Sequence, residues 1–264
     1  MQRIEGFVYL KTMINYKVNK MVGQKLVPWY TDGVPSVMNH IVYSDCRPNQ
    51  NGLGKTCNMN YVSNDTPAKL VVQTPKMYAP FGAKEWEAKE PNKLPKWDLV
   101  LNFKGNSVMM NTFTDLIKAI DESNITHAFN NQESFFSEKG KSRDIIADRY
   151  SSLYNSKDSK YDPKLNTKLD VRNGQFNGQI YDANENIQTI EYVTAQSYVQ
   201  ALIEFGSLWV VDKRFGMTIR SIQLMVHKQD QIDKLSIVPM DTDEDIKTHF
   251  QNDQLSEEEI DESE

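Results

Sequence analysis

The segment "YVQALIEFGSLWVVDKRFGMTIRSIQLMVHK", residues 198–228, contains two apolar runs separated by the charged break "DKRFG" at residues 212–216. Apolar runs that are joined by a short polar break indicate two strands connected by a turn. We therefore expect residues 201–211 and 217–227 to pair as an antiparallel hairpin. Neither run alternates cleanly between apolar and polar residues, which is expected for strands that are partly buried on both faces.

The rest of the chain predicts further strands and fewer helices. Residues 97–103 alternate apolar and polar side chains, as in a half-buried strand. Residues 109–120 place apolar side chains at helical spacing, and residues 143–154 contain a second helical pattern. Residues 44–60 are dense in Asn, Gly and Pro and are expected to form a polar surface loop or hairpin tip. The sequence thus predicts a mainly β fold with helical insertions.

Composition is typical of a globular chain: 264 residues, 39% hydrophobic and 25% charged. The longest apolar runs, such as "LWVV" at residues 208–211, are too short to cross a bilayer, and no signal-peptide pattern follows Met1. The two cysteines, Cys46 and Cys57, are too few for a disulfide framework and fit a reducing compartment. We therefore expect an intracellular protein that does not associate with membranes.

The last 24 residues, "DTDEDIKTHFQNDQLSEEEIDESE" (241–264), contain eleven acidic residues and a single basic one, Lys247. The remainder of the chain has 25 acidic and 29 basic residues, so its net charge is opposite in sign to that of the tail. Few apolar residues and a dense charge run predict disorder. We expect residues 1–240 to form a single folded domain and residues 241–264 to form a disordered acidic tail.

Sequence motifs of catalysis are weak or missing. The run "NGLGKT" (residues 51–56) has the Gly-Lys-Thr of a phosphate-binding P-loop, but Asn49 occupies the position of the first glycine. Cys46, Cys57 and His40 could supply three zinc ligands without an evident fourth, so a metal site stays open beside two structural thiols. Neither GxSxG nor HExxH occurs. We expect no catalytic residues, no cofactor and no enzymatic activity.

Basic and aromatic residues alternate in two regions, in a pattern typical of single-strand binding. Aromatic rings stack on unpaired bases, and Lys and Arg neutralise phosphates without reading sequence. The alternative, that these rings are part of the core, stays open for each of them. The candidate nucleic-acid contacts are Lys76, Tyr78, Phe81, Lys84, Trp86 and Lys104 in the first region, and Trp209, Lys213, Arg214, Phe215 and Arg220 in the second.

Three stretches resemble a known family. They are "QTPKMYAPFGAKEW" (73–86), "WDLVLNF" (97–103) before an amphipathic helix, and "IEFGSLWVVDKRFGMTIRSIQLMV" (203–226). Together they are similar to the single-stranded-DNA-binding replication proteins of large eukaryotic DNA viruses, a group thought to be related to the short-tailed-coliphage single-stranded-DNA-binding protein. The resemblance covers residues 70–226 and the acidic character of the tail.

The resemblance implies an elaborated OB-fold, that is, a five-stranded Greek-key barrel with inserted helices. It also implies sequence-independent binding of unpaired DNA and a tail that docks replication partners. The loop at residues 75–82 and the turn at residues 213–216 match the family's motifs. The chain departs from the phage pattern at its end, because it closes on Glu264 and its tail's only aromatic residue is Phe250.

We therefore expect a non-enzymatic protein that binds and protects single-stranded DNA during replication, recombination or repair, at sites of viral DNA replication. A tail of about 24 residues has a reach of roughly 25–30 Å, enough to compete with DNA for a basic groove. Expected partners are single-stranded DNA and, through Phe250, Leu255 and Ile260 of the tail, DNA polymerase or other replication proteins. A homodimer stays open. The alternatives are a scaffold protein that binds basic partners through the tail without binding nucleic acid and, more weakly supported, a nuclease or other metal-dependent enzyme.

Overall fold

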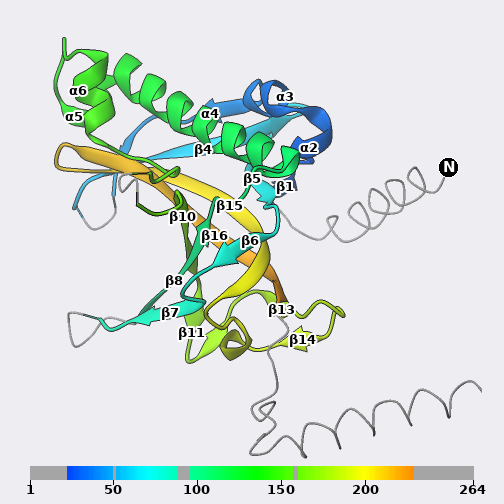
Figure 1. Ribbon diagram of the computed structural model, residues 1–264. Helices are drawn as coiled ribbons and strands as arrows, with labels where there is room; N and C mark the ends of the chain where they lie inside the picture. Colours follow the sequence, from blue (N-terminus) through cyan, green and yellow to red (C-terminus); the bar gives the residue numbers. More distant parts are fainter. Residues whose placement is uncertain (1–22, 50–51, 89–94, 157–159, 229–264) are drawn as a thin grey trace, which may run out of the picture. The chain divides into compact units, whose positions relative to one another are not determined.

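The structure, a computed structural model, describes residues 23–49, 52–88, 95–156 and 160–228. Within these residues the chain is mainly β with a few helices, as the sequence predicts (Figure 1). The helices are α2 (Trp29–Asp32), α3 (Val34–Met38), α4 (Val108–Asn130), α5 (Gln132–Phe136), α6 (Arg143–Asp148) and the 3₁₀ turn η1 (Ile190–Tyr192). The strands before α4 are β1 (Gln24–Leu26), β2 (Ile41–Tyr43), β3 (Arg47–Pro48), β4 (Lys55–Ser63), β5 (Thr66–Gln73), β6 (Met77–Ala79), β7 (Ala83–Trp86) and β8 (Lys96–Asn102). Those after it are β9 (Tyr150–Ser151), β10 (Lys164–Leu169), β11 (Val171–Arg172), β12 (Gln175–Phe176), β13 (Gln179–Tyr181), β14 (Ile187–Gln188), β15 (Ser197–Val211) and β16 (Arg214–His227).

The longest feature is the antiparallel hairpin of β15 and β16, which run side by side in Figure 1. The predicted pairing is confirmed, but the turn is tighter than expected. Only Asp212 and Lys213 lie between the strands, and Asp212 has the positive φ of 53° that a two-residue hairpin turn requires. Arg214 and the residues after it therefore belong to β16.

Strand β15 pairs with β16 along one edge and with three strands in succession along the other. Its start pairs with β6, its middle with β5 and its end with β4. The pairings β15–β6, β6–β8, β8–β10, β10–β16 and β16–β15 close a circuit of five strands. Apolar side chains fill the inside of this circuit, among them Leu99, Leu101, Leu165, Val199 and Leu224, each 0% exposed.

Helix α4 begins after Ser107, whose side chain accepts a hydrogen bond from the Met110 backbone N–H and so caps the first turn. The helical periodicity of residues 109–120 is confirmed. Phe113 and Ile117 lie on the buried face, and the Phe113 ring packs against Trp29 and Phe103. The helix thus covers apolar side chains that the strands alone leave exposed.

Two sequence expectations are wrong in part. Within residues 44–60, β3 and β4 pair as the predicted hairpin, but these residues are not one surface loop, because β4 begins at Lys55 and buries Cys57 and Met59. The second helical pattern ends at Asp148, and Tyr150 and Ser151 form the short strand β9 against β16. The domain boundary near Met240 and the acidic tail lie outside the described residues.

Candidate nucleic-acid interface

Strand β15 has one buried face and one that points away from the five-strand circuit. Val199, Ala201 and Ile203 are buried inside the circuit. Because side chains alternate along a strand, Tyr198, Gln200, Leu202 and Glu204 lie on the opposite face, here called the outer face. The outer face continues on β16, where cross-strand partners share a face with the β15 residues they oppose.

A cluster of two tyrosines and two lysines lies at the start of β15. Tyr198 is the cross-strand partner of Tyr78 on β6, and their ring centroids are 5.5 Å apart. The Lys76 ammonium is 5.7 Å from the centre of the Tyr198 ring, and the Lys104 ammonium is 5.1 Å from that of Tyr78. We call Lys76, Tyr78, Lys104 and Tyr198 the tyrosine cluster. It combines partly exposed aromatic rings with mobile positive charges.

The backbone next to the tyrosine cluster is fixed by a close approach at Gly82. Its φ is +62°, and a Cβ atom there would lie 2.3 Å from the Val193 carbonyl oxygen. The next residue, Ala83, donates its backbone N–H to that same oxygen at 2.9 Å. A side chain at position 82 would therefore push the loop away from the segment before β15. This contact accounts for the glycine at position 82.

The middle of the outer face is hollowed by a small cavity of about 100 Å³. Its lining includes the amides of three glutamines together with Leu202, and amides offer hydrogen-bond donors and acceptors. Gln200 Oε1 is 3.0 Å from His227 Nε2, and the Gln223 amide donates to Gln179 at 3.1 Å. The remaining lining residues are Gln73, Tyr181, Ala201, Leu224 and Met225.

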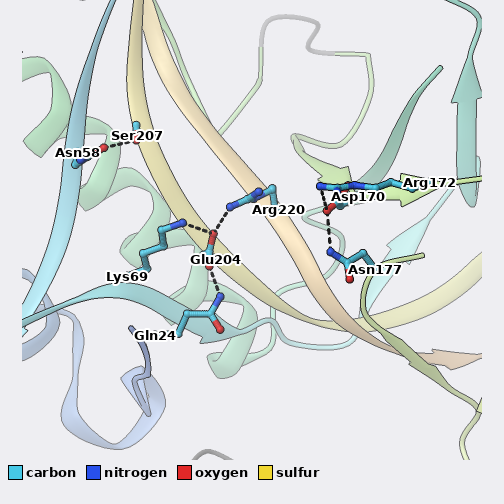
Figure 2. Close-up of polar contacts among 9 residues, drawn as sticks. All are labelled: Gln24, Asn58, Lys69, Asp170, Arg172, Asn177, Glu204, Ser207 and Arg220. Carbon is cyan, nitrogen blue, oxygen red and sulfur yellow. Dashed lines mark hydrogen bonds and ion pairs between the residues drawn. The ribbon is translucent and has the colours of Figure 1, made fainter. Parts of the chain in front are cut away.

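Beyond the cavity lies Glu204, whose side chain is only 3% exposed because two cations and an amide cover it (Figure 2). Arg220 Nη2 is 2.7 Å and Lys69 Nζ is 3.3 Å from the same carboxylate oxygen, and Gln24 donates to the other oxygen. Burial by itself would raise the pKa of Glu204. The hydrogen bonds from Gln24 and Arg220 and the two positive charges outweigh burial and lower that pKa.

The two cations at Glu204 stay partly accessible. The side chain of Lys69 is 47% exposed and that of Arg220 is 43% exposed. One ionised carboxylate faces two positive charges, so the group has a net positive charge that is available to an anion. We call Gln24, Lys69, Glu204 and Arg220 the Glu204 cluster.

The strand register extends this charge across five strands. Lys84 lies opposite Asp98, Asp98 opposite Lys168, Lys168 opposite Arg220, and Arg220 opposite Glu204. Directly opposed residues share one face of a sheet, so these side chains form a transverse row. With Lys69, the row has four cations and two carboxylates, and it crosses the line of the tyrosine cluster and the cavity.

Arg220 also links the row to a second arginine. The Arg172 guanidinium pairs with both carboxylate oxygens of Asp170, at 3.0 and 3.2 Å, and Asn177 donates to the same carboxylate at 3.0 Å (Figure 2). Hydrogen bonds from Asn177 and Arg172 lower the pKa of Asp170, and the charge of Arg220 adds to this effect. The Arg172 side chain is 69% exposed, so it adds an accessible guanidinium to the same region.

The far end of β15 presents Trp209. A register shift between Phe205 and Leu208 reverses the alternation, and Leu208 and Val210 are buried, so Trp209 lies on the outer face. Trp209 lies opposite Gly216, where a Cβ atom would come within 2.7 Å of the indole ring. The absence of a side chain at position 216 therefore lets the indole pack against the backbone of β16. Nearby, Ser207 donates to Asn58 at 2.6 Å across β4 and β15 (Figure 2). The outer face thus has a partly exposed aromatic residue at each end.

The structure brings some of the predicted contact residues together and separates others. Lys76, Tyr78 and Lys104 meet in the tyrosine cluster, and Lys84 and Arg220 lie in the transverse row. Phe81 and Trp86 are exposed, at 59% and 49%, and the Lys84 ammonium is 4.1 Å from the centre of the Trp86 ring. Trp209 lies at the end of the outer face. Arg214 is exposed at the hairpin tip, and Lys213 pairs with Glu138 at 2.8 Å; Phe250, Leu255 and Ile260 lie outside the described residues.

The prediction for Phe215 is corrected. Its side chain is 0% exposed, and its ring packs against Phe135, Phe136 and Tyr150 at centroid distances of 5.0–5.9 Å. Because the hairpin turn contains only two residues, Phe215 is part of β16, opposite the buried Val210. Its ring belongs to the core and is not available to a base.

Several residues of the interface were missed from the sequence. Tyr198 opens the last apolar run, where its alternation with Gln200, Leu202 and Glu204 could have revealed an outward face. Lys69, Lys168 and Arg172 come from separate strands, and only the strand register brings them beside Arg220 and its partners.

The structure also bears on the phosphate-loop and metal alternatives. Gly54, Lys55 and Thr56 lead into strand β4, whereas a P-loop opens a helix, so that alternative is wrong. His40 stacks on Tyr61 and does not join the cysteines. Within the described ranges, no three His, Cys, Asp or Glu side chains are grouped so that they could hold a metal ion.

In the same ranges, no helix is long and apolar enough to span a membrane.

Comparison with known proteins gives one family match. Residues 98–239 match the model of a family described as "Family of unknown function (DUF5871)". No curated protein matches the chain.

Three solved structures show a distant likeness. The single-stranded DNA-binding protein from bacteriophage Enc34 in complex with ssDNA is 10% identical, with a TM-score of 0.41 over 71% of this chain and 98% of that one. Its C-terminal truncation is 10% identical, with a TM-score of 0.41 over 73% and 98%. The single-stranded DNA binding protein gp2.5 encoded by bacteriophage T7 is 9% identical, with a TM-score of 0.44 over 64% and 97%. At this level of likeness, the function has to be argued from the residues of this chain.

Proposed function

We propose a function for this chain, which belongs to the DUF5871 family of unknown function: it binds single-stranded DNA along the outer face of β15 and β16. The observation that supports this proposal is the arrangement of one strand face. Along this face the tyrosine cluster, the amide-lined cavity and the transverse row follow one another. Their β15 residues are Tyr198, Gln200, Leu202 and Glu204.

Each part of the face suits a different part of a nucleotide. Aromatic rings stack on unpaired bases and contribute roughly 1–3 kcal/mol per base. Lys69, Arg172 and Arg220 are partly exposed and suit phosphate oxygens, with arginine able to contact two of them at once. Stacking requires a base that is free of its duplex partner, so the surface favours single strands over duplex. Phosphate contacts carry no sequence information, so we propose binding that does not depend on sequence.

The biological setting that we propose is DNA replication, recombination or repair, without an enzymatic activity of the chain itself. We further propose that the acidic tail at residues 241–264 competes with DNA for the cations of the transverse row. DNA would displace the tail and free Phe250, Leu255 and Ile260 for replication partners. Supporting this part of the proposal are the eleven acidic residues of the tail and the accessible cations near Glu204.

We also propose that the circuit of five strands is an elaborated OB-fold. Its support is the number of strands and the closure of their pairing through β15 and β16. An OB-fold is a five-stranded Greek-key barrel that binds oligonucleotides on one face.

The deciding experiment is a fluorescence-anisotropy titration of the full chain with single-stranded DNA, the matching duplex and the matching RNA. We expect nanomolar to micromolar binding of oligo-dT, weaker binding of duplex, and a log–log salt slope of about −0.7 for each phosphate contacted. Equal affinity for single-stranded and duplex DNA would contradict the proposal. Failure to bind all three probes would also contradict it.

Deletion of residues 241–264 tests the tail separately. If the tail competes for the DNA site, the truncated chain binds oligo-dT more tightly, and the difference shrinks at high salt because competition between charges is screened. A second variant replaces the acidic residues of the tail with Ser, Gln and Asn at constant length. It removes the charge of the tail without shortening it, and it should also bind oligo-dT more tightly. An unchanged affinity in both variants would refute the competition while leaving the proposal for the outer face intact.

A further inference from the structure

The chain has two cysteines, Cys46 directly before β3 and Cys57 on β4, and these two segments run side by side. Arg47 on β3 pairs with Thr56 on β4, which places Cys46 and Cys57 each one residue beyond this pair. On the other side, the Ser44 backbone N–H donates to the Asn58 carbonyl at 2.9 Å, which holds the two segments together beyond the cysteines. Both thiols are free, each affects the pKa of the other, and the Cys57 thiol donates to the Ser44 carbonyl oxygen at 3.0 Å.

The geometry of such a pair suits a disulfide. The contacts at Ser44 and at Arg47 hold the two segments side by side on either side of the cysteines. Adjacent strands lie about 4.7–4.9 Å apart, and disulfides join Cα atoms that are about 4.4–6.8 Å apart. A bond between the two sulfur atoms would therefore need little backbone movement. Lack of a third ligand argues against a metal: in the part of the chain that the structure describes, no group of three possible ligands includes the two thiols.

The two thiols differ in environment in the way that an oxidisable pair requires. Cys46 is partly exposed, and its interaction with Cys57, with further contributions from Ser134 and the Lys55 charge, lowers its pKa despite partial burial. Cys57 is 0% exposed, and its interaction with Cys46 together with burial raises its pKa. Cys46 is therefore the more accessible and the more readily ionised of the two thiols, and Cys57 is the protected one.

A histidine completes the surroundings of Cys57. His127 Nε2 is 3.6 Å from Cys57 Sγ, and the His127 ring is stacked on Tyr43 with the centroids 4.3 Å apart. Burial lowers the pKa of His127, so the imidazole is neutral near pH 7. These contacts hold Cys57 in place beneath Cys46 while leaving Cys46 open to solvent.

We propose that Cys46 and Cys57 form a peroxide-sensitive dithiol that closes to an intramolecular disulfide. The Cys46 thiolate attacks a peroxide oxygen, which gives Cys46 sulfenic acid and releases hydroxide when the peroxide is hydrogen peroxide. The Cys57 sulfur then attacks the sulfenic sulfur; its proton and the departing OH leave as water, and the S–S bond forms. The peroxide is reduced by two electrons and the dithiol is oxidised by two.

The disulfide would tie β3 and the segment before it to β4. Cys57 faces His127 of α4, whereas the neighbouring Thr56 lies opposite Trp209. The oxidised pair is thus on the other side of β4 from the outer face, and this proposal does not rest on the proposed binding of DNA.

Peptide mass mapping of the full chain after treatment with hydrogen peroxide tests the proposal. We expect loss of two hydrogens, a peptide that links Cys46 to Cys57, no dependence on protein concentration, and recovery of both thiols with dithiothreitol. The oxidised protein should also have a higher Tm, because the disulfide restricts the unfolded chain. Oxygen adducts on the two cysteines without a linked peptide would overturn the proposal, as would links only between chains.

Variants assign the roles. Cys57→Ala should let dimedone label Cys46 as sulfenic acid, and Lys55→Gln should slow the oxidation of Cys46 severalfold. Lys139→Gln, which removes an exposed lysine from the loop after α5, is the matched control and should leave the rate unchanged. If Cys57→Ala does not fold, dimedone competition on the unmodified chain gives the same assignment. Labelling of Cys57 in preference to Cys46, or equal rates for the two lysine variants, would contradict the assigned roles.

Discussion

Arg220 on β16 lies directly opposite Glu204 on β15, and its guanidinium is 2.7 Å from the nearly buried carboxylate. Lys69 reaches the same carboxylate oxygen from β5. Two cations on one acid leave a surplus of positive charge on a face that also presents aromatic rings.

Arg220→Ala should weaken binding of oligo-dT at all base compositions alike and make the salt slope shallower by about 0.7, because one phosphate contact is lost. Glu204 keeps Lys69 and Gln24 as partners in this variant, so we expect the fold to persist. Anisotropy titrations at several salt concentrations measure both quantities. Lys139→Ala removes an equal charge from the loop after α5 and is expected to change neither.

Tyr198→Ala should reduce the affinity for single-stranded DNA by about 1–3 kcal/mol, since it removes a stacking ring from the tyrosine cluster. Tyr198→Phe keeps the ring and should bind almost as well as the unmodified chain. The control is Tyr161→Ala, because Tyr161 is 64% exposed and lies in a loop away from β15 in the sequence. Similar losses in the Tyr198→Ala and Tyr161→Ala variants would argue against a stacking role for Tyr198.

Phe215→Ala should lower the free energy of unfolding by about 3–5 kcal/mol, because it opens a cavity among Phe135, Phe136 and Tyr150. Phe81→Ala should change stability by no more than about 0.5 kcal/mol, because Phe81 is 59% exposed. Urea unfolding curves measure both values. A stable Phe215→Ala variant that loses only DNA affinity would restore Phe215 to the interface.

Glu204→Gln should show how the buried carboxylate depends on pH. The pKa of Glu204 is lower in the folded chain than its unfolded value of about 4.3, so its ionised form adds stability above that value. The stability advantage of the unmodified chain over the variant should be constant from pH 7 to about 5. It should then shrink as the pH falls through the folded pKa. Urea unfolding at a series of pH values measures it, and an advantage that grows on acidification would reverse the assigned sign.

Patterns within single segments predicted much of the fold. The hairpin of β15 and β16, helix α4 and strand β8 follow from local periodicity and turn residues, because each buries one regular set of its own side chains. Strand β4 was overlooked because Asn58 and Asn60 suggest a loop. In fact they alternate with the buried Cys57, Met59 and Tyr61, and Asn58 accepts a hydrogen bond from Ser207 on β15. Polar residues on the outward side of a strand can thus conceal its period.

The candidate interface was less predictable, because strand pairing assembles it. The sequence indicated Tyr78 and Arg220 but gave no reason to place Tyr198 beside the first or Lys69 beside the second. Phe215 was misassigned because the length of a turn decides on which face the next residue points. One residue more or fewer in a turn reverses the face of every side chain that follows.

Strand β15 pairs with β6, β5 and β4 in succession along one edge and with β16 along the other. Strand β15 therefore belongs both to the five-strand circuit and to the group formed by β4 and β5. Local opening of β15 would disrupt the hydrogen bonds of both. Its central backbone amides should exchange with deuterium only when the whole domain unfolds. A ligand held on this strand would consequently rest on the slowest-exchanging part of the domain, while mobility is left to the loops around it.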